Sequence, residues 1–133
     1  MCTLLAKIQV EAGKEKDFEE VMAYMYRETQ QEEGVLRYEY WRGTAPGFYY
    51  CLLSFTDTLT FWRHQASDHH EGQMANFQAC IANLELEVVD PVTTASPLPA
   101  TQEQALPEGE TELVKTQAAQ FPINSAAWWR LHL

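Results

Sequence analysis

The chain has 133 residues, 46% hydrophobic and 21% charged, which is the composition of one ordinary globular domain. Nineteen acidic residues against nine basic ones give a formal charge of −10, which argues against nucleic acid as a partner because a polyanion would be repelled. The sequence has no apolar run near the roughly 20 residues that a membrane span needs, and its start, MCTLLAKIQV, lacks the features of a secretory signal. Cys2, Cys51 and Cys80 form neither a C-x-x-C pair nor a zinc pattern. We therefore expect a cytoplasmic protein with reduced, mostly buried thiols.

The chain begins with a pattern that predicts a strand followed by a helix. In residues 3–10 every second position is apolar, which is typical of a half-buried strand. From Lys14 to about Glu32, apolar residues recur at helical spacing and predict a helix with one face toward a core. These residues are Phe18, Val21, Met22 and Met25. Gly34 stands where a left-handed C-terminal cap belongs.

Residues 35–42 (VLRYEYWR) and 48–55 (FYYCLLSF) are β-branched and aromatic runs on either side of a five-residue loop with two glycines and a proline. This pattern predicts an antiparallel hairpin. Alternation puts Leu36, Tyr38 and Tyr40 on one face of the first strand. The other face carries Arg37, Glu39 and Trp41, so neither face is plainly polar.

The next segment predicts two helical pieces and a final strand. Thr56-Asp57-Thr58 opens a short piece, and Ser67 is a suitable N-cap for the second. Apolar positions then step by four, three, four and three, and this stripe comprises His70, Met74, Phe77, Ile81 and Leu84. Residues 84–89 (LELEVV) predict the last strand, which Pro91 ends.

The order β-α-β-β-α-β over residues 3–90 predicts a ferredoxin-like α+β domain whose four-stranded antiparallel sheet is covered by helices on one face. We expect a second copy of the chain to cover the other face and form a homodimer. Residues 91–133 predict a proline-rich extension, and its apolar end, residues 126–133, is expected to dock on its own subunit or a partner. Trp128 or Trp129 could act as a lid if either reached a cavity.

Three segments of the domain together resemble the antibiotic biosynthesis monooxygenase family. They are LLAKIQVEAGKEKDFEEV, GVLRYEYWRG and SFTDTLTFWRHQASDHH, and the resemblance covers about residues 3–90. It implies a dimeric α+β barrel with one pocket per subunit. It also implies oxidation of an electron-rich phenol or quinol by O₂ without metal, flavin or haem, in which the deprotonated substrate itself donates an electron to oxygen.

Such chemistry needs a base, an apolar slot and donors that hold an oxyanion. We take His64 and His69 as candidate bases, because a neutral imidazole titrates near working pH. Candidate substrate-binding residues are Tyr38, Tyr40, Phe55, Trp62 and His70. His70 is more simply interpreted as a hydrogen-bonded residue at a helix start, and Trp62 as a core residue. A zinc site of His64, His69 and His70 would lack a supporting carboxylate or thiolate, so we expect no metal.

The sequence departs from the family where members often carry a glutamate in the third strand, because this stretch reads Leu52-Leu53-Ser54-Phe55. A base cannot be transferred from that position. Two alternatives therefore stay open: a non-catalytic dimer that binds a small hydrophobic ligand, and a haem-degrading monooxygenase. The haem-degrading branch uses an Asn on the first strand, which this sequence lacks.

Overall fold

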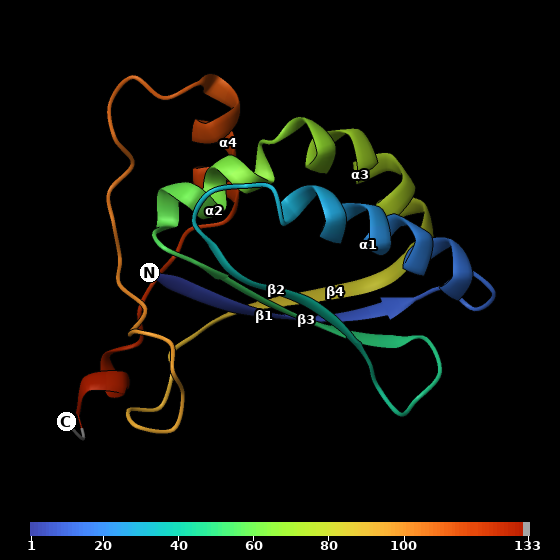
Figure 1. Ribbon diagram of the computed structural model, residues 1–133, viewed down its shortest axis with the longest axis horizontal. Coiled ribbons are helices and arrows are strands. Elements are labelled where there is room, and N and C mark those ends of the chain that lie inside the picture. Colours follow the sequence, from blue (N-terminus) through green and yellow to red (C-terminus); the bar gives the residue numbers. More distant parts are fainter. Residues whose placement is uncertain (132–133) are drawn as a thin grey trace.

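The computed structural model describes residues 1–131 and contains one four-stranded sheet with helices packed over one face (Figure 1). The strands are β1 (Cys2–Val10), β2 (Val35–Arg42), β3 (Phe48–Phe55) and β4 (Ile81–Val89). The helices are α1 (Glu15–Thr29), α2 (Thr58–Gln65), α3 (Asp68–Cys80), α4 (Glu112–Gln120) and the 3₁₀ helix η1 (Ala127–Arg130). Within residues 1–131, no helix has both the length and the apolar character needed to cross a bilayer.

The sheet has the strand order β2-β3-β1-β4, and every neighbouring pair is antiparallel. This order confirms the predicted ferredoxin-like α+β fold. The central strand β1 buries every second residue under the helices, as its alternating pattern predicts. Those core residues are Leu4, Ala6, Ile8 and Val10.

Local signals fix the two helices that carry histidines. Asp57 caps α2 by accepting a hydrogen bond from the Thr60 amide at 2.7 Å. Ser67 caps α3 by accepting from the His70 amide at 3.4 Å, so the predicted cap is confirmed.

Gly34 adopts φ +81°, and a Cβ there would lie 2.6 Å from Thr56 Oγ1, which explains the glycine. The preceding helix α1 ends at Thr29, earlier than expected, so Glu32 lies in the turn before Gly34.

Two element details differ from the sequence-based expectation. The helix α3 ends at Cys80, and Ile81 starts β4 without an intervening loop, because residues 81 and 84 pair with Val10 and Ile8 of β1. The apparent helical spacing of Ile81 and Leu84 therefore belongs to a strand. A bulge between Val35 and Arg37 leaves Leu36 43% exposed, so Leu36 does not share the buried face of Tyr38.

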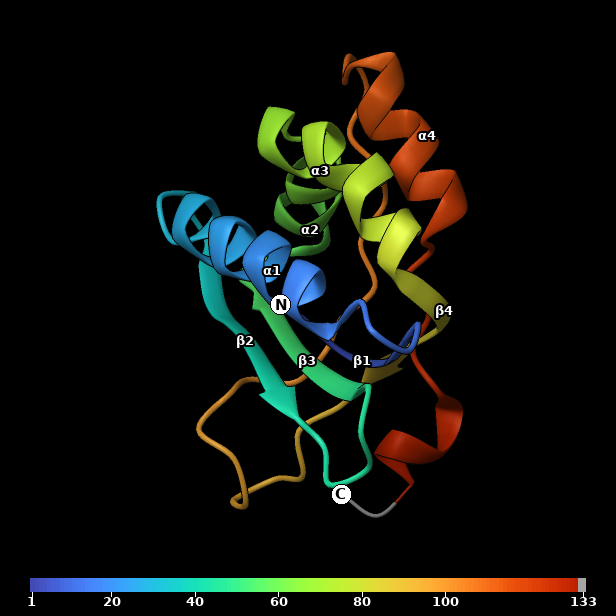
Figure 2. The ribbon, with the colours of Figure 1, turned by 90° about the vertical axis from the view of Figure 1, so that its right-hand side faces the viewer.

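The second face of the sheet carries exposed apolar side chains. Figures 1 and 2 show α1, α2, α3 and α4 on one side of the sheet. On the other face Leu5 is 39%, Tyr50 37% and Trp41 59% exposed, and Trp41 pairs directly with Tyr50 across β2 and β3. Among residues 1–131 no helix packs on this face, which leaves these apolar side chains exposed beside charged ones such as Glu39 and Glu87.

Residues 91–131 contain two helices, α4 and η1, where a linker was expected. The chain runs past one end of the sheet to α4 on the helical side and returns to η1 on the other side (Figure 1). Thr111 caps α4, a short helix that we did not predict, and Val114 and Ile123 are buried. The apolar end is attached through Arg130, which contacts Asp90 at 2.6 Å, while Trp128 stays 65% exposed. Docking of residues 126–131 on a partner, like the domain boundary at residue 90, stays a prediction, and 132–133 lie outside the described residues.

Candidate functional site

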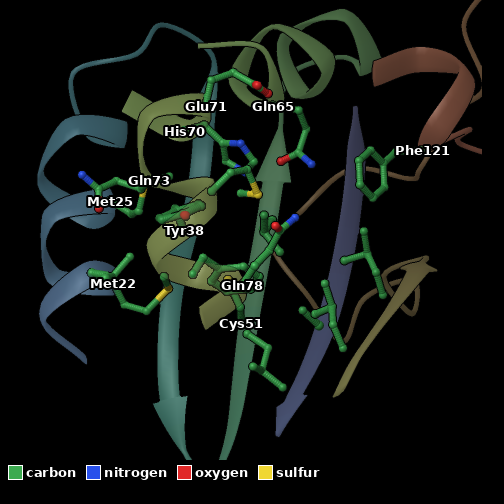
Figure 3. Close-up of a pocket in the computed structure, with 18 of the residues that line it drawn as sticks. Met22, Met25, Tyr38, Cys51, Gln65, His70, Glu71, Gln73, Gln78 and Phe121 are labelled. Atoms are coloured by element: carbon green, nitrogen blue, oxygen red, sulfur yellow. The ribbon is translucent and has the colours of Figure 1, made fainter. Parts of the chain in front are cut away.

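A cavity of about 270 Å³ lies between the core face of the sheet and the helices α1, α3 and α4 (Figure 3). Its two sides differ in chemistry. The sheet and α1 contribute apolar side chains, namely Ala6, Ile8, Met22, Met25, Leu53 and Leu86. The helices opposite contribute apolar side chains such as Met74 and Phe77 and, in addition, carboxamides, namely Gln65, Gln73, Gln78, Gln117 and Gln120. Such a cavity suits a flat molecule with one apolar face and a polar edge.

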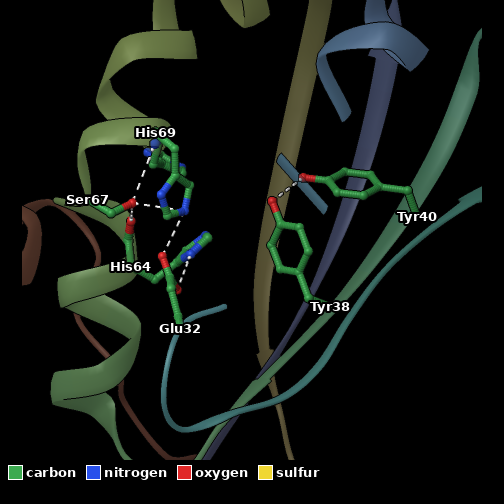
Figure 4. A network of polar contacts seen from close by, with 7 residues as sticks. Glu32, Tyr38, Tyr40, His64, Ser67 and His69 are labelled. Atoms are coloured by element: carbon green, nitrogen blue, oxygen red, sulfur yellow. Dashed lines mark hydrogen bonds and ion pairs between the residues drawn. The ribbon is translucent and has the colours of Figure 1, made fainter. Parts of the chain in front are cut away.

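Two tyrosine hydroxyl groups meet at the cavity. Tyr38 and Tyr40 both line it from β2, and their hydroxyl oxygens lie 2.9 Å apart in a hydrogen bond (Figure 4). Burial raises the pKa of Tyr38, and burial together with the neighbouring Tyr38 raises the pKa of Tyr40. Both phenols therefore stay protonated near neutral pH, and the hydroxyl that does not donate to its neighbour can donate to a ligand oxygen.

His70 is the histidine in the cavity wall. It lies in the first turn of α3, and its main-chain amide donates to the Ser67 cap. Its side-chain Nδ1 is buried without a hydrogen-bond partner. Burial, followed by the neighbouring His64 and His69, lowers the pKa of His70 from its ordinary value to about 3. The imidazole is therefore neutral near pH 7, with one ring nitrogen free to bind a ligand.

A polar network lies beside this wall. The Glu32 carboxylate joins two histidines: Oε2 is 2.9 Å from His64 Nδ1, and Oε1 is 2.8 Å from His69 Nε2 (Figure 4). Ser67 Oγ lies 3.2 Å from His69 Nε2, so the cap of α3 belongs to the same network. His64 is 2% exposed, and its Nε2 has no partner.

The donor atoms of Glu32, His64 and His69 all lie within 4.8 Å of one another. Two imidazoles and a carboxylate are a donor set of the kind that binds Zn²⁺. The turn residue Glu32 supplies the carboxylate that the sequence spacing of the histidines lacked. The same Glu32 carboxylate is hydrogen-bonded to His64 Nδ1 and lies within ion-pair distance of His69 Nε2, so it bridges the two imidazoles.

The structure separates the predicted site residues into two groups. Tyr38, Tyr40 and His70 line the cavity. His64 and His69 lie in the adjacent network and do not line this cavity, so a role as a base for either residue stays a prediction. His64 packs between the rings of Tyr38 and Phe55, at 5.2 and 5.4 Å between centroids.

Phe55 and Trp62 do not line the cavity, contrary to expectation. Phe55 packs on Phe61, at 5.4 Å between ring centroids, in the core. Trp62 turns toward the C-terminal segment, where its Nε1 donates to the carbonyl of Phe121 at 2.9 Å. Trp128 and Trp129 do not line the cavity in the part of the chain that the structure describes, where the C-terminal segment contributes Gln117, Gln120 and Phe121 to the wall.

Sequence reasoning missed most of the polar wall. Gln73 and Gln78 follow His70 by three and eight residues and thus share a helical face with it, a signal that the stripe of apolar residues obscured. Glu71 was overlooked in the same way. Gln117 and Gln120 carry no such signal, because only the tertiary fold brings α4 to the cavity.

The fold and the cavity define a ferredoxin-like α+β protein with a small-molecule-sized cavity between sheet and helices. The model of the antibiotic biosynthesis monooxygenase family matches residues 1–76, more than half of the chain, and the chain belongs to this family. The C-terminal part of α3, β4 and all of α4 lie outside the match. Comparison with curated proteins gave no match.

Solved structures share the fold at low sequence identity. A Pseudomonas aeruginosa protein is 20% identical with a TM-score of 0.64, covering 68% of this chain and 93% of that one. A conserved protein from Methanosarcina mazei Go1 is 23% identical with a TM-score of 0.63, covering 66% and 89%. A structure described as an antibiotic biosynthesis monooxygenase is 17% identical with a TM-score of 0.65, covering 69% and 99%. About a third of this chain therefore lies outside each of these matches.

Proposed function

We propose that the chain is a cofactor-independent monooxygenase that oxidises a small electron-rich phenol or quinol with O₂ in the cavity beside His70. Membership of the antibiotic biosynthesis monooxygenase family supports oxygen chemistry in general. The observation that carries the proposal is the meeting of a neutral imidazole and two phenolic hydroxyl groups in one largely apolar cavity. These are the groups that can remove a proton from a phenol and hold the resulting anion.

Each group has a proposed part in the reaction. The apolar wall binds the ring, and Nδ1 of His70 accepts the phenolic proton. An imidazolium is disfavoured in the empty cavity, but the phenolate formed beside it offsets this cost by charge pairing. The hydroxyl of Tyr38 or Tyr40 donates a hydrogen bond to the phenolate oxygen. His64 and His69, the bases proposed from sequence, then serve to hold α3 and the ring of His70 in position.

The phenolate supplies the electrons. In the oxidation of a phenol to a quinone, one oxygen atom of O₂ enters the ring and the other leaves as water with two hydrogens of the substrate. No further reductant is consumed in this balance. The role of the protein is to form and orient the anion and to shield it from bulk water.

We further propose that the chain works as a homodimer through the exposed sheet face, in the cytoplasm. The apolar surface around Leu5, Trp41 and Tyr50 supports the dimer, because a second copy is the simplest cover for it. The three buried, free cysteines support a reducing compartment.

Oxygen consumption tests the enzymatic proposal. Purified protein with 1-naphthol should consume O₂ faster than the uncatalysed reaction and form the quinone, and the variant His70→Gln should lose about tenfold or more of this excess rate. His69→Gln is the matched comparison, because it changes a neighbouring histidine outside the cavity wall. If His69→Gln abolishes the rate and His70→Gln preserves it, the base assignment is wrong. Absence of acceleration with any naphthol would contradict the enzymatic proposal itself.

A second candidate is a binding protein without turnover. The low pKa of His70 and the absence of a glutamate in the stretch Leu52–Phe55 favour it, because both weaken the case for a strong base. Saturable binding of naphthols without oxygen uptake would support this function. Haem degradation is less well supported, because about 270 Å³ is small even for a drug-sized ligand (roughly 300–1,000 Å³). A Soret band that appears when haemin is added to the protein would support haem binding and this function.

A further inference from the structure

The C-terminal segment completes the cavity wall. Gln117 and Gln120 of α4 line the cavity together with residues of the family domain. Phe121, directly after α4, lines it as well (Figure 3). All three lie beyond residue 76, where the family match ends. This part of the wall is therefore a feature that the family match does not describe.

Contacts with α2 and α3 hold the segment in place. Trp62 Nε1 donates to the Phe121 carbonyl at 2.9 Å, and the rings of Phe61 and Phe121 are 6.4 Å apart. Nearer the start of the segment, Arg63 donates to Glu110 at 2.6 Å. Because these contacts span both ends of α4, the helix has a defined position over the cavity.

Gln117 is the buried polar residue of this wall. Its side chain is 7% exposed, and its Nε2 donates to the Glu71 carboxylate at 3.2 Å. A carboxylate accepts hydrogen bonds, so this contact orients the amide and leaves Oε1 as the free acceptor. Gln117 Oε1 and His70 Nδ1 are both buried without a hydrogen-bond partner, and both residues line the cavity. An unpaired buried acceptor is costly, and a ligand that donates a hydrogen bond to it removes that cost.

We propose that Gln117 is a specificity-determining residue, and that its Oε1 accepts a hydrogen bond from a hydroxyl or N–H group on a compact aromatic ligand. The cavity volume of about 270 Å³ holds roughly nine waters at about 30 Å³ each, which corresponds to one or two fused rings. The ligand lies between the apolar sheet wall and the carboxamide wall, with its donor group toward α4. This inference rests on the cavity of the proposed function and names its substrate class.

Equilibrium binding of two probes to the full-length protein, measured under argon, tests the assignment. 1-Naphthol carries a donor, and 1-methoxynaphthalene has a similar shape without one. For Gln117→Met we expect binding of 1-naphthol to weaken about tenfold and binding of 1-methoxynaphthalene to stay within about twofold. Methionine keeps the length of the side chain, and far-ultraviolet circular dichroism will show whether the variant folds.

The matched control is Gln102→Met, the same substitution at an exposed position of the C-terminal segment, which should leave both affinities unchanged. Glu71→Gln provides a second variant, because it removes the carboxylate that orients the Gln117 amide and should reduce the preference for 1-naphthol over 1-methoxynaphthalene. Equal weakening of both probes in Gln117→Met, or no weakening of either, would overturn the assignment. Absence of saturable binding of both probes to the wild type would overturn the substrate class. Because no oxygen is present, failure of the oxidation reaction does not affect this test.

Discussion

Trp62 and Phe121 are joined by a hydrogen bond from the indole Nε1 to the main-chain carbonyl, 2.9 Å long, across 59 residues of sequence. The bond links α2, inside the family match, to the residue that ends α4, outside it. Trp62 is also 5% exposed, so its ring is buried where the two parts of the chain meet. This contact explains why an apparently pocket-forming tryptophan turns away from the cavity.

We expect Trp62→Phe to lower the free energy of unfolding by about 1–2 kcal/mol, because the Phe121 carbonyl loses its donor and the smaller ring leaves a gap. Amide hydrogen exchange of residues 112–123 should become faster in the variant than in the wild type, and this increase should be larger than any increase in β1. Trp128→Phe is the control, since Trp128 is 65% exposed. Unchanged exchange in α4 would show that other contacts hold the segment.

The network around Glu32 predicts a stability effect. Glu32→Ala leaves His64 Nδ1 and His69 Nε2 without their carboxylate partner, and we expect a loss of about 1–3 kcal/mol in chemical denaturation. Glu33→Ala, which removes the neighbouring exposed carboxylate, should change stability by less than about 0.5 kcal/mol. Stoichiometric uptake of Zn²⁺ by the wild type, lost in Glu32→Ala, would instead identify the network as a metal site.

His70 predicts a pH dependence of stability. Its pKa falls from the ordinary 6.5 to about 3 on folding, so between these values the unfolded chain binds a proton that the folded chain does not. Stability is therefore unaffected above pH 6.5 and falls as the pH drops through this window, by at most about 1.4 kcal/mol per pH unit. We expect the wild type to lose about 1–2 kcal/mol more than His70→Gln between pH 7 and pH 5. Parallel pH profiles for the two proteins would contradict the neutral state of His70.

The exposed sheet face predicts the oligomeric state. The wild type should elute with twice the 15.3 kDa mass of the chain, and Leu5→Glu should elute as a monomer, because it places a charge in the middle of that face beside Glu87. Leu113→Glu is matched in exposure, 41% against 39% for Leu5, but lies on α4 and should stay dimeric. Light scattering after gel filtration measures both masses. A monomeric wild type at high concentration would exclude the dimer.

The order of strands and helices within residues 3–90 was predictable because each of these elements has a local sequence pattern. In β1 every second residue is buried, and in α1 the buried residues Phe18, Met22 and Met25 recur at helical spacing. In both elements the period in the sequence matches the burial in the structure. The boundary between α3 and β4 was not predictable in this way, because Ile81 continues a helical spacing and yet pairs with Val10. Long-range strand pairing decides that boundary, and local spacing does not contain this information.

The candidate site was only partly predictable for the same reason. Tyr38 and Tyr40 could be found because strand alternation places both on one face. Glu32 could not be linked to His64 and His69, because the turn that brings it to α2 and α3 depends on how α1 packs. Gln117 was hidden by its proline-rich surroundings, which suggested a linker although Thr111 offered a helix cap.

The path of the C-terminal segment also couples the cavity to the stability of α4. Gln117, Gln120 and Phe121 line the cavity, and Phe121 is held by the hydrogen bond from Trp62. A ligand that binds the folded cavity therefore stabilises the packing of α4 as well, because binding to the folded form alone raises the free energy of unfolding. Ligand occupancy and protection of this helix from proteolysis should consequently rise together.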